Sequence, residues 1–255
     1  MKILVLNPMV SQDMTDGCAK WCKEHSDSEC ELVCEGLTYG CDVIKHPLGI
    51  AMSAMAEVEA VIEAERKGYD AVTLLCFYDP NLEALYTAVD IPVVGPLTVS
   101  CYYAAMLGDK FSCLLPCNCN PATEVRLVRT TGLESRLASV RGVEFTDPEM
   151  TVDKAIACSL TKFDSPEAED LVQDIVNTCI KCIDEDGARA MIIAAGGFIF
   201  LGNRIRKGLK DRGYQIPVIE PLPLAIEVAK NLIKLKLGVS REIYRKSVEQ
   251  YVAKC

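Results

Sequence analysis

One cysteine stands where a thiol could do chemistry. Residues 68–80, GYDAVTLLCFYDP, predict a glycine helix stop, a buried strand over residues 71–75, and then Cys76. Asp79 and Pro80 are typical of a helix N-cap and first turn, so Cys76 is expected between the end of a strand and the start of a helix. Ligands of open parallel sheets bind at that edge, where unpaired amides and the helix dipole favour a thiolate. We therefore predict that Cys76 is the reactive group; the alternative is a small buried hydrophobic side chain.

Other side chains are expected at the same edge. Asn7 follows a first buried strand over residues 2–6 and either holds a ligand or satisfies a local turn. Phe77, Tyr78 and Asp79 would offer backbone amides next to Cys76. His46, in a predicted loop over residues 38–50, is a further acid or base, although a solvated loop histidine is the simpler interpretation.

The sequence contains an internal repeat. When Gly68 is set on Gly187, the strand before Cys76 matches residues 190–195, and Cys76 falls on Ala195. Residues 91–96 (IPVVGP) likewise resemble residues 216–221 (IPVIEP), and residues 2–8 resemble residues 110–116. Two copies of one α/β unit are therefore expected, which is too few for a solenoid.

The edge of the second copy has its own candidates. Gly196 and Gly197 would let a ligand approach backbone amides that run on to Phe198, or would only make a tight turn. Cys117 and Cys119 lie in the loop after the second copy's first strand and are the nearest candidates for a second acid or base by sequence.

The predicted fold class is α/β, with two pseudo-symmetric lobes that each hold a short parallel sheet flanked by helices. Residues 1–96 plus 217–255 would form the first lobe, with Cys76, and residues 97–216 the second, with Ala195, leaving the site in the cleft between the lobes. Helices are expected over residues 13–24, 53–67, 80–89, 99–107, 122–131, 199–212, 224–236 and 241–254, with others beginning near residues 147 and 165. The helix over 53–67 would bury Met55, Val58 and Ile62.

Composition excludes several functions. The 255 residues are half apolar and carry a net charge of −9 with both signs interspersed, which argues against nucleic acid or a membrane as a partner. The chain start shows no export signal, so a cytoplasmic protein with reduced thiols is expected. The 14 cysteines and two histidines form no zinc-knuckle pattern, so no metal is predicted. A charged last helix over residues 241–254 would face solvent or another subunit of a homo-oligomer.

Two facing sheet edges suit proton transfer at a carbon acid without a cofactor. One group removes a proton from one face of a small substrate while another donates on the opposite face, and fixed amides hold the carbanion. The sequence contains no P-loop, no GxGxxG motif and no Ser-His-Asp signature.

At this point the motifs match a known family. Residues 3–8 (ILVLNP), 76–80 (CFYDP), 92–95 (PVVG), 104–108 (AAMLG) and 217–220 (PVIE) together resemble the Asp/Glu/hydantoin racemase superfamily, most closely its hydantoin racemase branch, along nearly the whole chain. The resemblance implies two pseudo-symmetric lobes and a mechanism without pyridoxal phosphate. It also implies one cysteine per lobe on either face of the substrate's α-carbon, and Cys76 falls on the first of them.

The sequence departs from the family at the second cysteine. Where the family has Gly-Cys-Ala-Gly, this chain has Ala194-Ala195-Gly196-Gly197, and Met9-Val10 replaces a usually polar pair. Three interpretations stay open: a racemase or isomerase that uses Cys76 with a substitute donor, a one-thiol lyase similar to the family's malonate decarboxylases, and a binding protein that has lost catalysis.

Overall fold

The computed structural model shows an α/β protein built from two compact units, and it describes residues 1–116, 121–161, 165–195, 198 and 201–246. Unit 1 is Met1–Pro96 together with the chain from Ala225 onward, and unit 2 is Leu97–Leu224. The predicted boundary after residue 216 is therefore too early, because the strand at residues 218–219 pairs within the sheet of unit 2.

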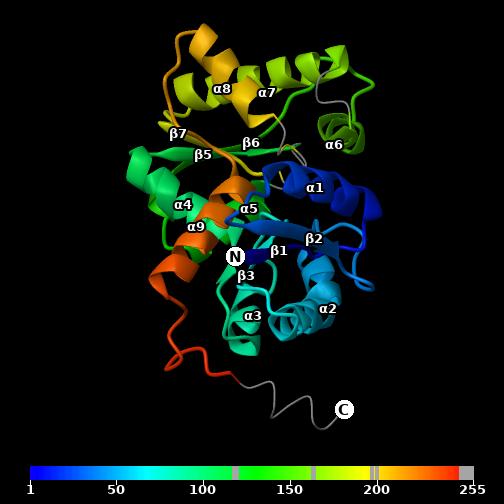
Figure 1. Ribbon diagram of the computed structural model, residues 1–255. Helices are drawn as coiled ribbons and strands as arrows, with labels where there is room; N and C mark the ends of the chain where they lie inside the picture. Colours follow the sequence, from blue (N-terminus) through cyan, green and yellow to red (C-terminus); the bar gives the residue numbers. More distant parts are fainter. Residues whose placement is uncertain (117–120, 162–164, 196–197, 199–200, 247–255) are drawn as a thin grey trace. The chain divides into compact units, whose positions relative to one another are not determined.

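Unit 1 holds a four-stranded parallel sheet of order β2-β1-β3-β4. Its strands are β1 (Lys2–Asn7), β2 (Glu31–Gly36), β3 (Ala71–Leu74) and β4 (Val93–Val94), and its helices are α1 (Gln12–His25), α2 (Pro47–Arg66), α3 (Leu82–Ala88) and most of α9 (Pro221–Leu235). In Figure 1, α1 covers one face of this sheet while α2 and α3 cover the other. The strands in the middle of the sheet are buried on both sides, as expected for parallel strands between helices.

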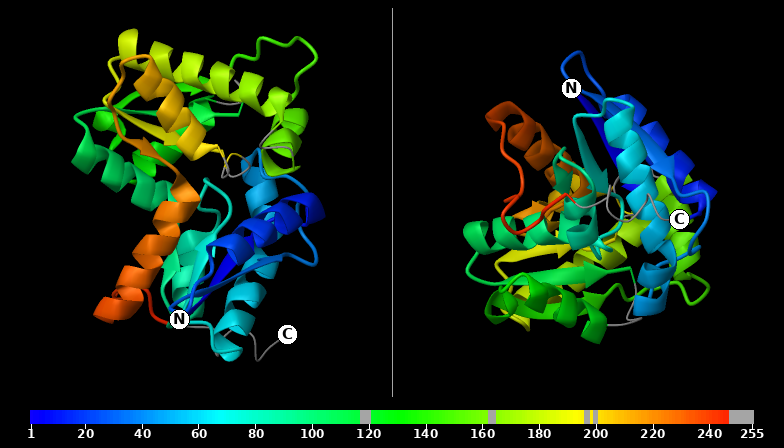
Figure 2. Two further views of the ribbon diagram at one scale, coloured as in Figure 1. Left: turned by 45° about the horizontal axis from the view of Figure 1, so that its top comes forward. Right: turned by 90° about the horizontal axis from the view of Figure 1, so that it is seen from below.

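Unit 2 repeats the same topology with the order β6-β5-β7-β8, again all parallel. Its elements are α4 (Pro96–Leu107), β5 (Phe111–Leu115), α5 (Pro121–Thr130), the short η1 (Glu134–Arg136), β6 (Leu137–Gly142), α6 (Val152–Thr161), α7 (Pro166–Asp184), β7 (Ala190–Ile193), α8 (Gly202–Asp211) and β8 (Val218–Ile219). The left view of Figure 2 shows α7 and α8 side by side over the sheet. The two-copy α/β fold predicted from the repeat is confirmed.

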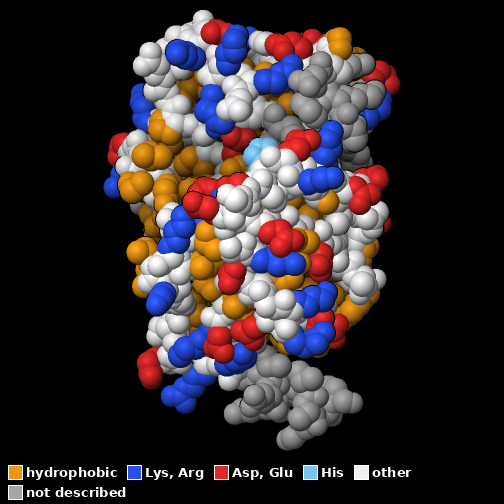
Figure 3. Space-filling model, in the orientation of Figure 1, with side chains coloured by type: hydrophobic (Ala, Val, Ile, Leu, Met, Phe, Trp, Pro, Cys, Tyr) orange, Lys and Arg blue, Asp and Glu red, His pale blue; other side chains and the backbone are white. Residues whose placement is uncertain are grey.

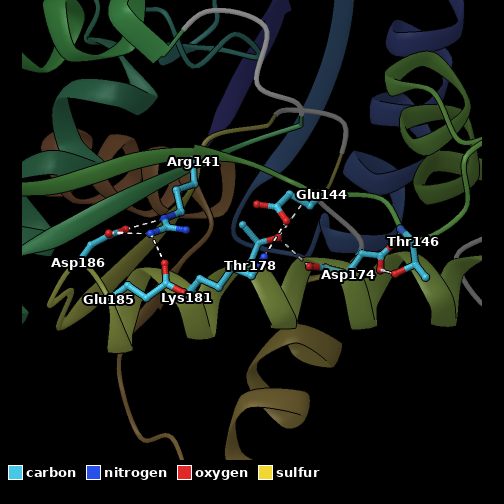
Figure 4. A network of polar contacts seen from close by, with 8 residues as sticks. All are labelled: Arg141, Glu144, Thr146, Asp174, Thr178, Lys181, Glu185 and Asp186. Atoms are coloured by element: carbon cyan, nitrogen blue, oxygen red, sulfur yellow. Dashed lines mark hydrogen bonds and ion pairs between the residues drawn. The ribbon is translucent and has the colours of Figure 1, made fainter.

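A polar network fastens β6 and the segment after it to α7 (Figure 4). The Nε of Arg141 lies 2.6 Å from Oδ2 of Asp186, and this hydrogen bond lowers the pKa of the Asp186 carboxyl. Further along, the backbone N–H of Thr146 donates to Asp174, which is buried near the middle of α7. The hydroxyl of Thr146 donates to the other oxygen of the same carboxylate, and these two hydrogen bonds let Asp174 be buried.

Several predicted helix bounds are corrected by the structure. Helix α2 begins at Pro47, a favourable first-turn residue, so His46 is its N-cap and the preceding loop is shorter than expected. The buried side chains of α2 include Ser53, Ala56, Glu57, Val61 and Ala64, whereas Met55 is exposed. The small residues among them let the helix lie close to the sheet. The first helix after β6 is α6, which begins at Val152 and not near residue 147.

The predicted last helix is also wrong as far as the structure describes it. Residues 241–246 form a turn and irregular structure but no helix, and residues 247–254 lie outside the described part of the chain. Arg241 donates to the carbonyl oxygens of Tyr86 and Val89 at 2.8 and 2.6 Å, and the ring of Tyr244 lies edge-on to that of Tyr86. These contacts dock the segment on the end of α3, so its shape is set by tertiary contacts and not by helix propensity. None of the helices in the described part of the chain has the length and apolar character needed to cross a bilayer.

Candidate active site

Cys76 lies at the carboxyl edge of the unit 1 sheet. The side chains of β3 are fully buried, and the backbone N–H of Leu75 still donates to Leu6 of the neighbouring strand at 2.8 Å. Leu75 and Phe77 are buried, whereas Cys76 between them is half-buried. Cys76 is thus the first position after β3 that is reached by solvent, at the edge where parallel sheets bind ligands.

The sequence predicts that a helix begins at Pro80, soon after Cys76, and this prediction is wrong. Asp79 and Asn81 have φ values of 47° and 54°, and α3 begins only at Leu82 with Asn81 as its N-cap. The left-handed backbone of Asp79 replaces the extended conformation that is usual for an N-cap, and no helix begins at Pro80. The N–H of Asp79 donates to the carbonyl oxygen of Cys76 at 3.3 Å, so this amide serves the loop itself. Residues 77–79 are therefore not the first turn of a helix, and their role toward a ligand stays a prediction.

A glycine holds the same loop against β4. A Cβ atom built on Gly95 would lie 2.3 Å from Oδ2 of Asp79 and 2.5 Å from its Cγ. The Asp79 carboxylate therefore occupies the space that any side chain at position 95 would need. This close approach fixes the loop that carries Cys76 onto the end of the neighbouring strand.

Asn7, at the end of β1, is fully buried, and its Nδ2 donates to the Ser11 carbonyl at 3.2 Å and to Oγ1 of Thr15 at 3.0 Å. The amide group thus ties the start of α1 to the sheet. Its Oδ1 has no hydrogen-bond partner among the described residues and is the part left to accept a bond. A ligand role for Asn7 stays a prediction.

Sequence reasoning missed a buried acid beneath the Cys76 loop. Glu57 of α2 accepts a hydrogen bond from Nδ2 of Asn81 at 3.1 Å, and the same nitrogen donates to the Ile50 carbonyl at 3.1 Å. Burial raises the pKa of Glu57 to about 8. The amphipathic pattern of this helix places its acids on the solvent-exposed face, so the sequence alone does not show that Glu57 is buried.

The matching edge of unit 2 carries no thiol among the described residues. Ala195 and Phe198 are buried at the end of β7. Gly196, Gly197, Cys117 and Cys119 lie outside the described residues, so their predicted roles remain predictions.

Unit 2 also has a carboxylate that sequence reasoning overlooked. Glu220 follows β8, and its Oε1 pairs with Arg206 of α8 at 2.7 Å. A Cβ on Gly202, the first residue of α8, would overlap this carboxylate, which thus lies at the positive end of the helix dipole. The sequence did contain a hint of this carboxylate. In the matched segments 91–96 and 216–221, the strongest difference is at the fifth position, where unit 1 has Gly95 and unit 2 has Glu220.

Burial separates several of the other thiols from Cys76. It raises the pKa of Cys182 to about 11 and holds the pKa of Cys113 and Cys179 well above the usual value for a thiol. Cys179 is fully buried in the hydrophobic core of unit 2. These thiols are therefore protonated at neutral pH, and a protonated thiol is a poor nucleophile.

Comparisons with known proteins extend these observations. The chain is 27% identical over 254 residues to a hydantoin racemase of Paenarthrobacter aurescens, covering 98% of this chain and 99% of that protein. It is 26% identical over 242 residues to a hydantoin racemase of Pseudomonas sp. strain NS671, covering 94% and 89%. Among solved structures, allantoin racemase of Pseudomonas fluorescens shares the fold with a TM-score of 0.79 at 22% identity over 96% of both chains.

A family model agrees with these relatives over most of the sequence. The model described as Asp/Glu/Hydantoin racemase matches residues 3–229, which include both sheets, Cys76 and the position of Ala195. This chain therefore belongs to the Asp/Glu/hydantoin racemase family and is an enzyme of the racemase type.

Proposed function

We propose that this racemase acts without a cofactor at the α-carbon of a small carboxylate, amino acid or hydantoin, with the Cys76 thiolate as the group that takes and returns the proton. The observation that carries the proposal is the half-buried Cys76 at the carboxyl edge of β3, between buried neighbours. Hydantoins are the favoured class, because the relatives at 26% and 27% identity are named hydantoin racemases.

The proton balance needs two groups. In a hydantoin the hydrogen on the ring carbon beside a carbonyl is acidic, so the thiolate can remove it to give a thiol and an enolate. A proton delivered by a second group to the opposite face of the enolate then inverts the carbon. The Cys76 thiol afterwards releases its proton to solvent and the second group takes one from solvent, so both return to their starting states. Because Ala195 cannot supply the second proton, we assign that role to Cys117 or Cys119 as candidates.

The first test is solvent exchange in D2O with optically pure hydantoins, amino acids and carboxylates, followed by proton NMR and optical rotation. We expect deuterium to enter the α-position while optical rotation decays. Release of bicarbonate from a substituted malonate without α-exchange of any other substrate would contradict racemisation and favour the one-thiol lyase. Thermal stabilisation by these compounds without any turnover would instead favour a binding protein.

A further inference from the structure

Glu57 is an acid that the core does not need for its stability. It is 0% exposed in the middle of α2, and its Oε2 has no hydrogen-bond partner among the described residues. The described part of the chain also places no Lys or Arg in an ion pair with it. A buried carboxyl with one unsatisfied oxygen destabilises the folded state, so packing alone would favour an apolar residue here.

The internal repeat shows what an apolar residue does at this place. Glu57 precedes Gly68 by 11 residues, and Val176 precedes Gly187 by 11, while the two glycines have matching φ values of 80° and 77°. Val176 is likewise fully buried, and it packs against Gly208 of α8. Unit 1, which carries Cys76, therefore has a glutamate at this position, whereas unit 2, which has Ala195 in place of the cysteine, has a valine.

The one hydrogen bond that the described residues give to the Glu57 carboxyl leads to the Cys76 loop. Both N–H bonds of the Asn81 amide point at α2, one to Ile50 and one to Glu57. Asn81 has a left-handed backbone, which asparagine tolerates better than most residues, and it ends the loop that starts at Cys76. Within that loop the Asp79 N–H donates to the Cys76 carbonyl, so a shift of residues 79–81 would be passed to Cys76.

We propose that Glu57 is a positioning residue for Cys76: by holding Asn81 it fixes the loop over residues 76–81 and thereby the direction in which the thiol leaves the sheet edge. This inference rests on the role proposed above for Cys76. Glu57 does not touch the reacting atoms in this account. It acts only through Asn81 and the loop.

The test compares Glu57→Val, which copies unit 2, with Glu57→Gln, which keeps a side-chain oxygen for Asn81. Asn81→Gly keeps the left-handed backbone but removes the amide. For each variant we would measure kcat and KM for α-exchange, the alkylation rate of Cys76 by iodoacetamide over a range of pH, and Tm. Misplacement of a reacting group by about 1 Å costs on the order of 100-fold. We therefore expect Glu57→Val and Asn81→Gly to lower kcat by about 10- to 100-fold with KM little changed.

Stability is expected to move differently from activity. Glu57→Val should have an unchanged or higher Tm, because it removes an unsatisfied carboxyl, and yet slower Cys76 alkylation. Glu57→Gln should recover most of the lost kcat, and the double variant Glu57→Val/Asn81→Gly should be no slower than either single change.

Two results would overturn the inference. The first is a Glu57→Val variant whose kcat and rate of Cys76 alkylation equal those of the wild type. The second is a Glu57→Gln variant that loses as much kcat and alkylation rate as Glu57→Val does. Failure of the proposed function is distinguishable, because the wild-type protein would then turn over no substrate. The alkylation rates would still report whether Glu57 governs the Cys76 loop.

Discussion

The reactivity expected of Cys76 follows from its exposure in a chain of mostly buried sulfurs. Cys113, Cys179 and Cys182 are buried, and burial raises the pKa of each thiol. Cys34 and Cys41 are half-buried, as Cys76 is, but neither follows a central strand of the sheet. Location, and not exposure alone, is what distinguishes Cys76.

We predict that Cys76 is alkylated faster at neutral pH than any other cysteine of the native protein. The check is brief iodoacetamide labelling followed by peptide mass spectrometry, with Cys41 as the half-buried internal reference. Equal labelling of Cys76 and Cys41 would remove the idea of an activated thiolate at the sheet edge.

The positions of Cys76 and Ala195 could be found from the sequence because the repeat aligned two strands with the same burial pattern. The structure of the following loop could not be found that way. Two consecutive signals, Asp79 and Pro80, are typical of a helix start, but Asp79 and Asn81 both adopt a left-handed backbone and the helix begins only at Leu82. The role proposed for Glu57 could not be predicted from the sequence either, because it depends on a hydrogen bond from Asn81, which is distant in sequence.

At the level of elements, the fit between the Cys76 loop and β4 should depend on the absence of a side chain at position 95. Gly95→Ala would place a Cβ 2.3 Å from Oδ2 of Asp79, so the loop must shift. We expect a loss of about 1–3 kcal/mol in the free energy of unfolding, as is typical of overpacking. Denaturant unfolding measures it.

Gly238→Ala is the matched control for that change. Its added Cβ would meet no atom within 4 Å. This substitution should therefore change stability by no more than about 0.5 kcal/mol. Equal effects of the two substitutions would contradict a close contact between Asp79 and Gly95.

The buried Glu57 on α2 should make stability depend on pH. Its pKa is raised from 4.5 to about 8 in the folded protein, so between these values the native state holds a proton that the unfolded state has released. Its contribution to stability is therefore complete below about pH 4.5 and is lost as pH rises to about 8, at about 1.4 kcal/mol per pH unit at most.

Glu57→Gln cannot titrate, so it isolates this effect. We expect the unfolding free energy of the wild-type protein, relative to that of Glu57→Gln, to fall between those pH values and then level off. A constant difference across the range would show that Glu57 is not a buried carboxylic acid. Parallel urea titrations at several pH values provide the measurement.

At the scale of the whole molecule, the apolar surface of α4 favours self-association. Its 12 residues include no charged side chain, and Tyr102, Met106 and Leu107 are 54%, 70% and 52% exposed. Figure 3 shows hydrophobic side chains gathered over this helix. A helix that is apolar all round is normally buried, and a second copy of the chain is the occupant we propose.

We predict that the protein sediments as a homo-oligomer and that Met106→Glu with Leu107→Glu shifts it toward the 27.9 kDa monomer. The solvated control is Met52→Glu on α2, where a single charge should leave the assembly intact. A wild-type protein that is monomeric at micromolar concentration would refute this prediction.

We propose that the sulfur of Cys76 takes the proton from the substrate's α-carbon. The most direct test compares three proteins: the wild type, Cys76→Ser and the control Cys41→Ser. For each, the rate at which deuterium from D2O enters the α-position of an optically pure substrate is measured. We expect Cys76→Ser to lose exchange by at least about 100-fold, while Cys41→Ser keeps it. Exchange that survives in Cys76→Ser at the wild-type rate would contradict a role for Cys76 in the proton transfer.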